Sequence, residues 1–173
     1  MITKEAWERV RGWFTGRLPE AWRVAPPEIT IDRDEITVVL TIEDVDLPDG
    51  SSDAERAEAR AGRAKAFRED TRDHRIRIAR EAEHRFDRKV SWAVRVGDRT
   101  ELFTHVAAPT MTRLRQPERL VLDTLVDAGV ARSRADALAW CVRLVRQHEG
   151  DWLGELRDAM EHVADVRDRG PAA

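Results

Sequence analysis

The sequence is poor in residues that build cross-links, metal centres and catalytic sites. It has a single cysteine, Cys141, so a disulfide within the chain and a zinc site built from cysteines are excluded. Its five histidines never pair at the spacing of a helical metal site. No serine stands in a nucleophile elbow, and no glycine-rich loop is present that could cradle a phosphate. We therefore expect no enzyme activity and no cofactor.

Long apolar runs are also missing. No stretch approaches the length of a membrane-spanning helix, and the N-terminus lacks the uninterrupted apolar segment of a secretory signal. Charged residues make up 36% of the chain and hydrophobic residues 42%, a balance typical of a folded soluble protein. We therefore expect a cytoplasmic protein with no membrane partner. Its 173 residues suffice for one full core or two small ones.

Lysine is scarce, since only three of the thirty basic residues are lysine. So strong an arginine bias more often reflects genomic nucleotide composition than phosphate recognition, and the arginine count alone carries little weight. The net charge of −3 argues against indiscriminate binding to nucleic acid. Residues 106–150 nevertheless hold seven basic and five acidic side chains, so this segment is mildly basic within an acidic protein.

The first hundred residues alternate between helical and strand patterns. An apolar stripe from Trp7 to Leu18 predicts a helix. Period-two alternation predicts one hairpin over residues 29–42 and another over residues 90–104. Between the hairpins, residues 54–86 contain no proline and predict one long helix, for which Gly62 offers a point of interruption.

The resulting order, α-ββ-α-ββ, predicts an N-terminal α+β domain over residues 1–106. We expect its helices to pack on an antiparallel four-stranded sheet. Its role stays open between sensing a ligand, contacting a protein partner and adding to dimerisation. The remainder, residues 107–173, predicts a mostly helical C-terminal region that ends in an amphipathic helix.

A short alternating run precedes the helices of the C-terminal region. Within it, Met111, Arg113 and Arg115 fall on one face of a candidate strand, while Leu114 falls on the other. The polar face could enter the major groove of DNA. A strand that begins earlier, near Ala108, would change which side chains face outward.

Two helices follow the candidate strand without a spacer. Pro117 suits the first turn of a helix, and Gly129 suits a left-handed stop. Ser133, followed three residues later by Asp136, resembles a capping box that opens a second helix at Arg134. The segment thus predicts a strand, a helix, a tight connection and a capped second helix.

This combination resembles the ribbon-helix-helix family of DNA-binding proteins, on an alternating strand followed by the run Gly129-Val130-Ala131-Arg132-Ser133-Arg134-Ala135-Asp136-Ala137. The resemblance covers residues 110–146. In that family two chains pair their strands into an antiparallel ribbon that enters the major groove, and the second helices meet phosphate with their N-termini. It implies a homodimeric, sequence-specific transcription regulator that binds double-stranded DNA. The implied DNA-contacting residues are Met111, Arg113, Arg115, Arg132, Ser133 and Arg134.

The alternative is a non-enzymatic interaction or assembly factor that homodimerises through the same helices and whose arginines are merely solvated. Three side chains distinguish the two hypotheses, namely Arg113, Arg115 and Arg134. If they share one exposed basic surface they favour DNA, whereas ion pairs with nearby carboxylates favour assembly. The carboxylates in question are Glu118, Asp123 and Asp136.

Three further features deserve a functional hypothesis beside a plain one. The acids from Asp44 to Glu55 imitate a calcium loop, but proline at its fifth position favours an ordinary acidic loop. Residues 56–80 carry nine basic and four acidic side chains, which could follow a nucleic-acid backbone, although such runs are usually solvated. Trp22 and Trp92 are candidates for base stacking. Core packing is the more probable role for Trp92, and we expect Trp22 to be exposed.

Overall fold

The computed structural model describes residues 3–104, 106–148, 150 and 152–169. The chain divides into two compact units, Met1–Pro109 and Thr110–Ala173. None of the helices formed by the described residues is both long enough and apolar enough to cross a membrane. Each unit is described by itself below.

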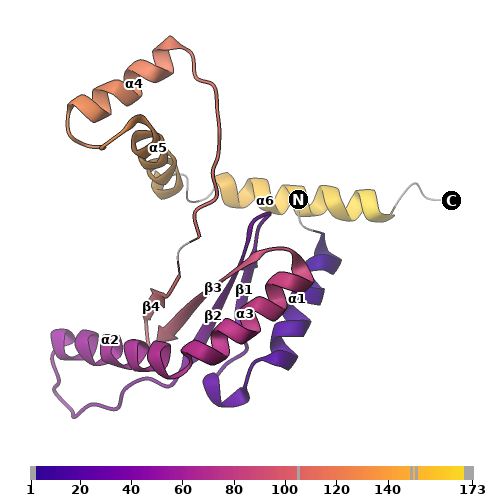
Figure 1. Ribbon diagram of the computed structural model, residues 1–173, viewed down its shortest axis with the longest axis vertical. Coiled ribbons are helices and arrows are strands. Elements are labelled where there is room, and N and C mark those ends of the chain that lie inside the picture. The colour runs from indigo at the N-terminus through magenta and orange to yellow at the C-terminus, as the bar shows by residue number, and fades with distance from the viewer. Residues whose placement is uncertain (1–2, 105, 149, 151, 170–173) are drawn as a thin grey trace. The chain divides into compact units, whose positions relative to one another are not determined.

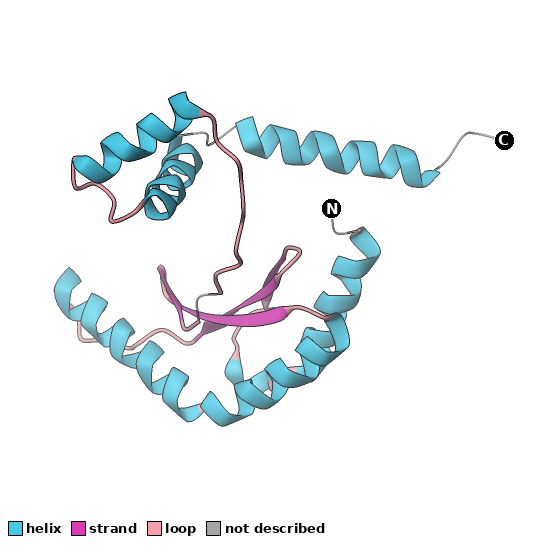
Figure 2. Ribbon diagram, turned by 45° about the horizontal axis from the view of Figure 1, so that its top comes forward, coloured by secondary structure: helices cyan, strands magenta, loops and turns pink. Residues whose placement is uncertain are grey.

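The N-terminal unit is an α+β fold in which three long helices lie on one face of a four-stranded sheet (Figure 2), which confirms the predicted fold class. The strands are ordered β1-β2-β3-β4 across the sheet. Along the chain (Figure 1) the elements are α1 (Lys4–Arg17), the short 3-10 helix η1 (Glu20–Trp22), β1 (Glu28–Ile31), β2 (Glu35–Ile42), α2 (Asp53–Asp70), α3 (Arg72–Phe86), β3 (Lys89–Val96) and β4 (Arg99–Leu102).

The sheet is mixed, so the prediction of an antiparallel sheet was wrong in one pairing. β1 pairs antiparallel with β2, and β3 pairs antiparallel with β4, as the two hairpins required. The central strands β2 and β3 run parallel, with a register that starts at Glu35 opposite Lys89. The connection through α2 and α3 returns the chain to the end of the sheet at which β2 begins, so β3 starts beside the start of β2. A helical crossover of this kind joins parallel strands.

The core lies between the sheet and its helices. Alternate residues of β2 and β3 point into it, so Val38 and Trp92, which are register partners, are both buried. Trp92 packs edge-on against Phe14 of α1, which confirms it as a core residue. The core side chains with no exposed surface are Phe14, Ile36, Val38, Leu40, Ile78, Ala82 and Val94.

The predicted long helix is interrupted at Thr71 rather than at Gly62. Thr71 is the one residue between α2 and α3, and Gly62 lies inside α2. The Thr71 hydroxyl donates to the Phe67 carbonyl over 2.6 Å and accepts from Arg75 Nε over 2.9 Å. Because threonine hydroxyls compete for helix carbonyls in this way, they favour local bends.

The C-terminal unit consists of three helices: α4 (Gln116–Asp127), α5 (Arg134–His148) and α6 (Trp152–Arg169). α4 packs against α5, with Pro117 in its first turn and α5 beginning at the predicted Arg134. The buried residues of this hairpin are few: Leu122, Ala131 and Ala137. The half-buried side chains that pack on them are Leu114, Leu125, Val126, Leu138 and Cys141.

Candidate nucleic-acid interface

The connection between α4 and α5 fixes where α5 begins. Gly129 adopts φ +73°, a left-handed conformation that glycine tolerates without steric cost. Its amide donates to the Val126 carbonyl, and the Val130 amide donates to the Leu125 carbonyl, each over 3.0 Å. The last turn of α4 is thereby closed, and the chain turns so that Ala131 enters the core.

Ser133 caps α5, as predicted. Its hydroxyl oxygen accepts from the Asp136 amide over 3.2 Å. Asp136 Oδ2 in turn accepts from the amide of Arg132 over 3.0 Å, one residue before the position that a standard capping box uses. An N-terminus arranged in this way offers amide groups and a partial positive charge to an anion.

The cap leads to a stability prediction. Ser133→Ala should lower the free energy of unfolding of the C-terminal unit by about 1 kcal/mol, because the Asp136 amide loses its acceptor. Ser133→Asn retains an acceptor and should unfold close to the native midpoint. Urea denaturation followed by far-ultraviolet circular dichroism measures both. An unchanged midpoint for the alanine variant would refute the cap.

The segment before α4 forms no strand in this chain, and the predicted alternation is seen only at Leu114, because Thr112, on the same expected face, is exposed. Met111 is 97% exposed, and Arg113 and Arg115 are also exposed. Leu114 points the other way and packs on the α4–α5 core. Residues 110–115 pair with no strand in the described part of this single chain. The ribbon therefore stays a prediction, because it needs a second chain.

The arginines of this region differ in how they are held. Arg134 makes a two-pronged ion pair with Asp123, with both nitrogen–oxygen distances 2.6 Å, and this pairing lowers the pKa of the Asp123 carboxyl. Arg132 is 98% exposed, and its Nε lies 4.0 Å from Asp136 Oδ2.

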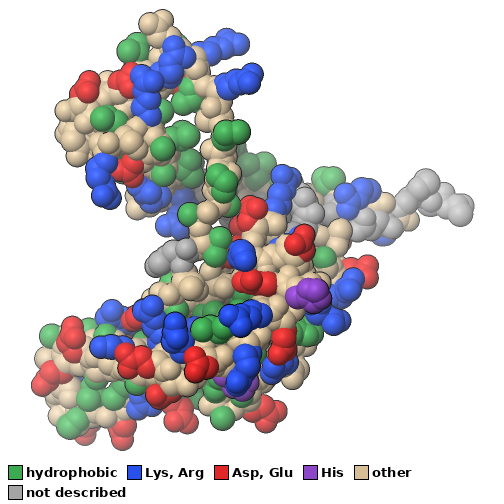
Figure 3. All heavy atoms as spheres, in the orientation of Figure 1, with side chains coloured by type: hydrophobic (Ala, Val, Ile, Leu, Met, Phe, Trp, Pro, Cys, Tyr) green, Lys and Arg blue, Asp and Glu red, His purple; other side chains and the backbone are tan. Residues whose placement is uncertain are grey.

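Arg113 and Arg115 take part in no ion pair within the described residues. Arginine side chains project from the place where this segment enters α4 (Figure 3). The DNA-binding hypothesis and the assembly hypothesis therefore each have an observation in their favour. Arg113 and Arg115 favour DNA, whereas the Arg134–Asp123 pair favours assembly.

Large apolar side chains are exposed along all three helices of the C-terminal unit. In the described N-terminal unit two such side chains are exposed, Val24 and Leu102, whereas the C-terminal unit has twelve. Exposed apolar side chains in this number are typical of a unit that forms an interface. The twelve are Met111, Leu120, Val121, Val130, Val142, Leu144, Val145, Trp152, Leu156, Met160, Val163 and Val166.

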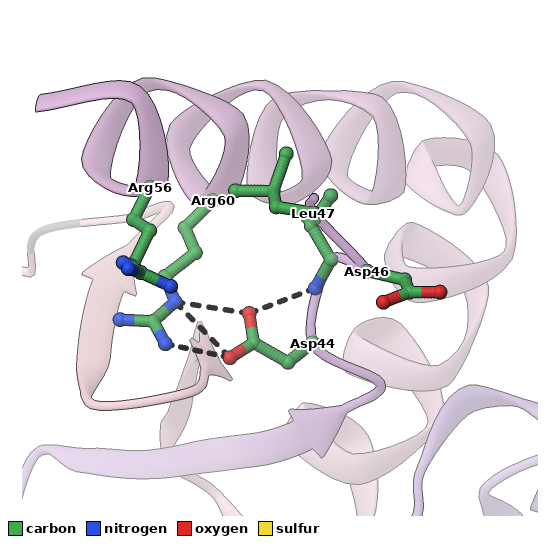
Figure 4. Close-up of a pocket in the computed structure, with 6 residues that line it drawn as sticks. Asp44, Asp46, Leu47, Arg56 and Arg60 are labelled. Atoms are coloured by element: carbon green, nitrogen blue, oxygen red, sulfur yellow. Dashed lines mark hydrogen bonds and ion pairs between the residues drawn. The ribbon is translucent and has the colours of Figure 1, made fainter. Parts of the chain in front are cut away.

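The acidic loop after β2 lines a small cavity of the N-terminal unit, of about 170 Å³ (Figure 4). Arg60 of α2 lines this cavity and donates hydrogen bonds to the Asp44 carboxylate from Nε and Nη2, at 2.9 and 2.6 Å. Arg60 also pairs with Asp98 in the β3–β4 turn. Arg60 lowers the pKa of the Asp44 carboxyl. The two carboxylates share one guanidinium, so the arrangement fastens two loops to α2.

Gly97 in the same turn yields a second stability prediction. It has φ +58°, and a Cβ added there would lie 2.5 Å from Arg60 Cζ. Because alanine is strained at this positive φ, Gly97→Ala should destabilise the N-terminal unit by about 1–2 kcal/mol, before any cost of displacing Arg60 is counted. Gly62→Ala is the matched control: nothing lies within 4 Å of its added Cβ, and inside a helix the change should stabilise by about 0.5–1 kcal/mol. Thermal melts should show shifts of opposite sign, and shifts of equal sign would contradict the Gly97 geometry.

A larger cavity, of about 540 Å³, opens beside Trp22 and Phe67. Trp22 is half-buried rather than exposed, because its ring packs edge-on against Phe67 and His74 at 5.9 and 5.0 Å between centroids. The sequence pattern around Trp22, next to a pair of prolines, had suggested a loop at the surface. Contacts with α2 and α3 could not be read from it.

The fold and the candidate interface define a two-unit protein, with a two-layer α+β unit followed by a helical unit that exposes much apolar surface. Residues 8–102 match the family model described as Rv1265-like protein, N-terminal domain, and residues 115–167 match the model described as Mb1296 C-terminal domain. The chain therefore belongs to the Rv1265-like family. Neither model describes a ribbon-helix-helix family.

Two mycobacterial relatives resemble the chain over most of its length. They are the uncharacterised proteins Mb1296 of Mycobacterium bovis and Rv1265 of Mycobacterium tuberculosis. Each is 55% identical over 159 residues, which span 92% of this chain and 69% of the relative. No solved structure matches the chain.

Proposed function

We propose that the protein is a homodimeric, sequence-specific DNA-binding transcription regulator of the ribbon-helix-helix type. The observation that carries the proposal is the inward orientation of Leu114 between exposed arginines before α4. There Met111, Arg113 and Arg115 are exposed while Leu114 packs inward. A segment that pairs with no strand among the described residues of its own chain is one that a second copy can complete by strand pairing.

The proposed contacts with DNA follow from this geometry. The ribbon would present Met111, Arg113 and Arg115 to the major groove, where the fork of arginine donors matches guanine. Arg132 and the amide groups at the Ser133-capped start of α5 would meet a phosphate. Arg134 would act at the same phosphate only where its pair with Asp123 opens, so we assign it the weaker contribution.

The exposed apolar surface supports the homodimer. The buried core of the α4–α5 hairpin has three residues, and two of them are alanines. So small a core gives little hydrophobic stabilisation, since that stabilisation scales with the apolar area buried. A second copy would cover side chains such as Val121 and Val142, which are 55% and 63% exposed.

The proposal includes a cytoplasmic location and no cofactor. Double-stranded DNA is the ligand of the C-terminal unit, and the N-terminal unit is left free to contact a protein partner or a small effector.

The second candidate is an assembly factor that homodimerises through its helices without binding DNA. The Arg134–Asp123 ion pair favours it, because a two-pronged pair engages the guanidinium that the DNA hypothesis assigns to phosphate. Both candidates require a dimer, so dimerisation alone does not separate them.

Gel-shift titration separates the two candidates. The probe is the duplex upstream of the protein's own gene, with a scrambled duplex of equal length as control. The regulator should bind the upstream duplex more tightly at physiological salt, and its affinity should fall steeply as salt rises, because phosphate contacts release counterions. Equal affinity for both duplexes, or no complex, would favour the assembly factor.

A further inference from the structure

Arg75 is a buried guanidinium without an acidic partner. The residue is 7% exposed on the sheet-facing side of α3. Its Nε donates to Thr71 Oγ1 over 2.9 Å, and its Nη2 donates to the Arg68 carbonyl over 2.7 Å. Both acceptors are neutral, and no ion pair joins Arg75 to a carboxylate in the described chain. Burying a charge in this way costs free energy unless a counter-charge offsets it.

Two more arginines lie beside it. Arg68 lies in the last turn of α2, before the bend at Thr71, and Arg72 begins α3 directly after it. Burial and, after it, the positive charges of Arg68 and Arg72 lower the pKa of Arg75 to about 10. Arg72 has one weak contact, 3.9 Å to the carboxylate of its neighbour Asp73.

Phe103 holds two of these guanidinium groups. Arg75 Cζ lies 4.8 Å from the centre of its ring and Arg68 Cζ lies 5.8 Å from it. Phe103 directly follows β4, and its amide donates to the Trp92 carbonyl over 2.7 Å. The aromatic ring thus fixes the guanidinium groups at the edge of the sheet but supplies no full negative charge.

Three other arginines of this unit hold elements together through carboxylates that neutralise them. Arg17 pairs with Glu81, Arg60 with Asp44, and Arg95 with Glu28. Each of these contacts uses two guanidinium nitrogens. Arg75 is more deeply buried than any of the three and pairs with no carboxylate among the described residues. The contrast indicates that the counter-charge at Arg75 comes from outside the chain.

We propose that Arg68, Arg72 and Arg75 form a binding site for a small phosphate-bearing molecule. Guanidinium groups match the oxygens of a phosphate with paired hydrogen bonds, and Arg75 Nη1 makes none of the bonds described above. Because Arg75 is recessed, a compact phosphate group can reach it more readily than the backbone of a duplex. The site does not depend on the proposed DNA-binding function, and it places a ligand beside Phe103, directly after β4.

Isothermal titration calorimetry on the full chain tests the site. The probes are inorganic phosphate and ribose 5-phosphate, with sodium acetate at matched ionic strength as the control anion. We expect saturable binding of at least one phosphate probe and none of acetate. Binding of inorganic phosphate alone identifies free phosphate as the ligand, and tighter binding of ribose 5-phosphate identifies a phosphate ester.

Two double variants assign the binding to the cluster. R68Q/R72Q removes two exposed guanidinium groups and should weaken the binding by about tenfold or more. R77Q/R80Q removes the same charge from exposed positions of α3 outside the cluster and should leave the affinity unchanged. Circular dichroism verifies that both variants fold.

Three outcomes overturn the proposal: no saturable phosphate binding to the native chain, equal weakening in both double variants, or no weakening in R68Q/R72Q. A loss of duplex DNA binding in R68Q/R72Q, without phosphate binding to the native chain, would instead assign the cluster to a nucleic-acid backbone. Failure of the DNA proposal leaves each of these results interpretable, because the titration contains no DNA.

Discussion

Leu114→Asp should convert the dimer into a monomer and loosen the α4–α5 hairpin. Leu114 packs on the cluster formed by Leu122, Ala131 and Ala137, and in the proposed ribbon two copies of Leu114 lie on its inner face. Dimerisation would bury the new carboxylate without a positively charged partner, which costs several kcal/mol. Dissociation also exposes the backbone of the ribbon. Sedimentation velocity at micromolar concentration should show the change in mass.

The matched control carries the same charge on the opposite face. Arg113→Asp puts a carboxylate at an exposed position whose native side chain forms no ion pair within the described residues. The dimer should therefore persist. If both variants sediment alike, the inward assignment of Leu114 is wrong. If the native chain is itself a folded monomer at micromolar concentration, the ribbon hypothesis fails.

Arg113→Ala and Arg115→Ala should each weaken binding to a cognate site by about 1–3 kcal/mol, or roughly 5- to 150-fold. The expected loss is large because a side chain that reads a base pair has no substitute when it is removed. Binding to non-specific duplex should change far less, since the phosphate contacts lie elsewhere. Fluorescence anisotropy with cognate and scrambled duplexes measures both affinities.

Arg146→Ala provides the control, because Arg146 is an exposed arginine in the last turn of α5. Its loss should leave the ratio of cognate to non-specific affinity unchanged. A uniform loss on all sequences for the Arg113 and Arg115 variants would make these residues phosphate contacts. If neither variant affects any binding, the assembly hypothesis takes the place of the regulator hypothesis.

Local signals in the sequence predicted the parts of the fold that depend on neighbouring residues. The alternation from Ile36 to Ile42 gave the buried face of β2, because side chains of a strand alternate at every residue. Ser133 and Gly129 marked the two ends of the α4–α5 connection, because a cap and a left-handed stop each act within one turn of helix. Leu114 faced inward for the same reason as the residues of β2.

Features that depend on distant residues were not predicted. Alternation tells which face of a strand is buried but not the direction of its neighbour, so the parallel pairing of β2 and β3 was missed. The Arg60–Asp98 pair joins residues 38 positions apart, beyond the reach of helical spacing. The Arg75 cluster was hidden for another reason: a basic run on a helix predicts a solvated face, and the bend at Thr71 turns Arg75 inward.

The candidate interface falls between these cases. The exposure of Arg113 and Arg115 followed from their position in an alternating segment. The pairing of Arg134 with Asp123 did not follow, because it depends on how α4 and α5 cross. Of the arginines assigned to DNA, Arg113 and Arg115 therefore test the hypothesis most cleanly.

Selection of binding sites from a pool of random duplexes, using the full native chain at physiological salt, tests the central claim most directly. A two-fold symmetric ribbon should enrich a short sequence with two inverted half-sites, because the symmetry of a dimer is repeated in its site. The same selection with the Arg113→Ala variant should lose part of that sequence. A pool that shows no enrichment with the native chain after repeated rounds would contradict sequence-specific DNA binding by this protein.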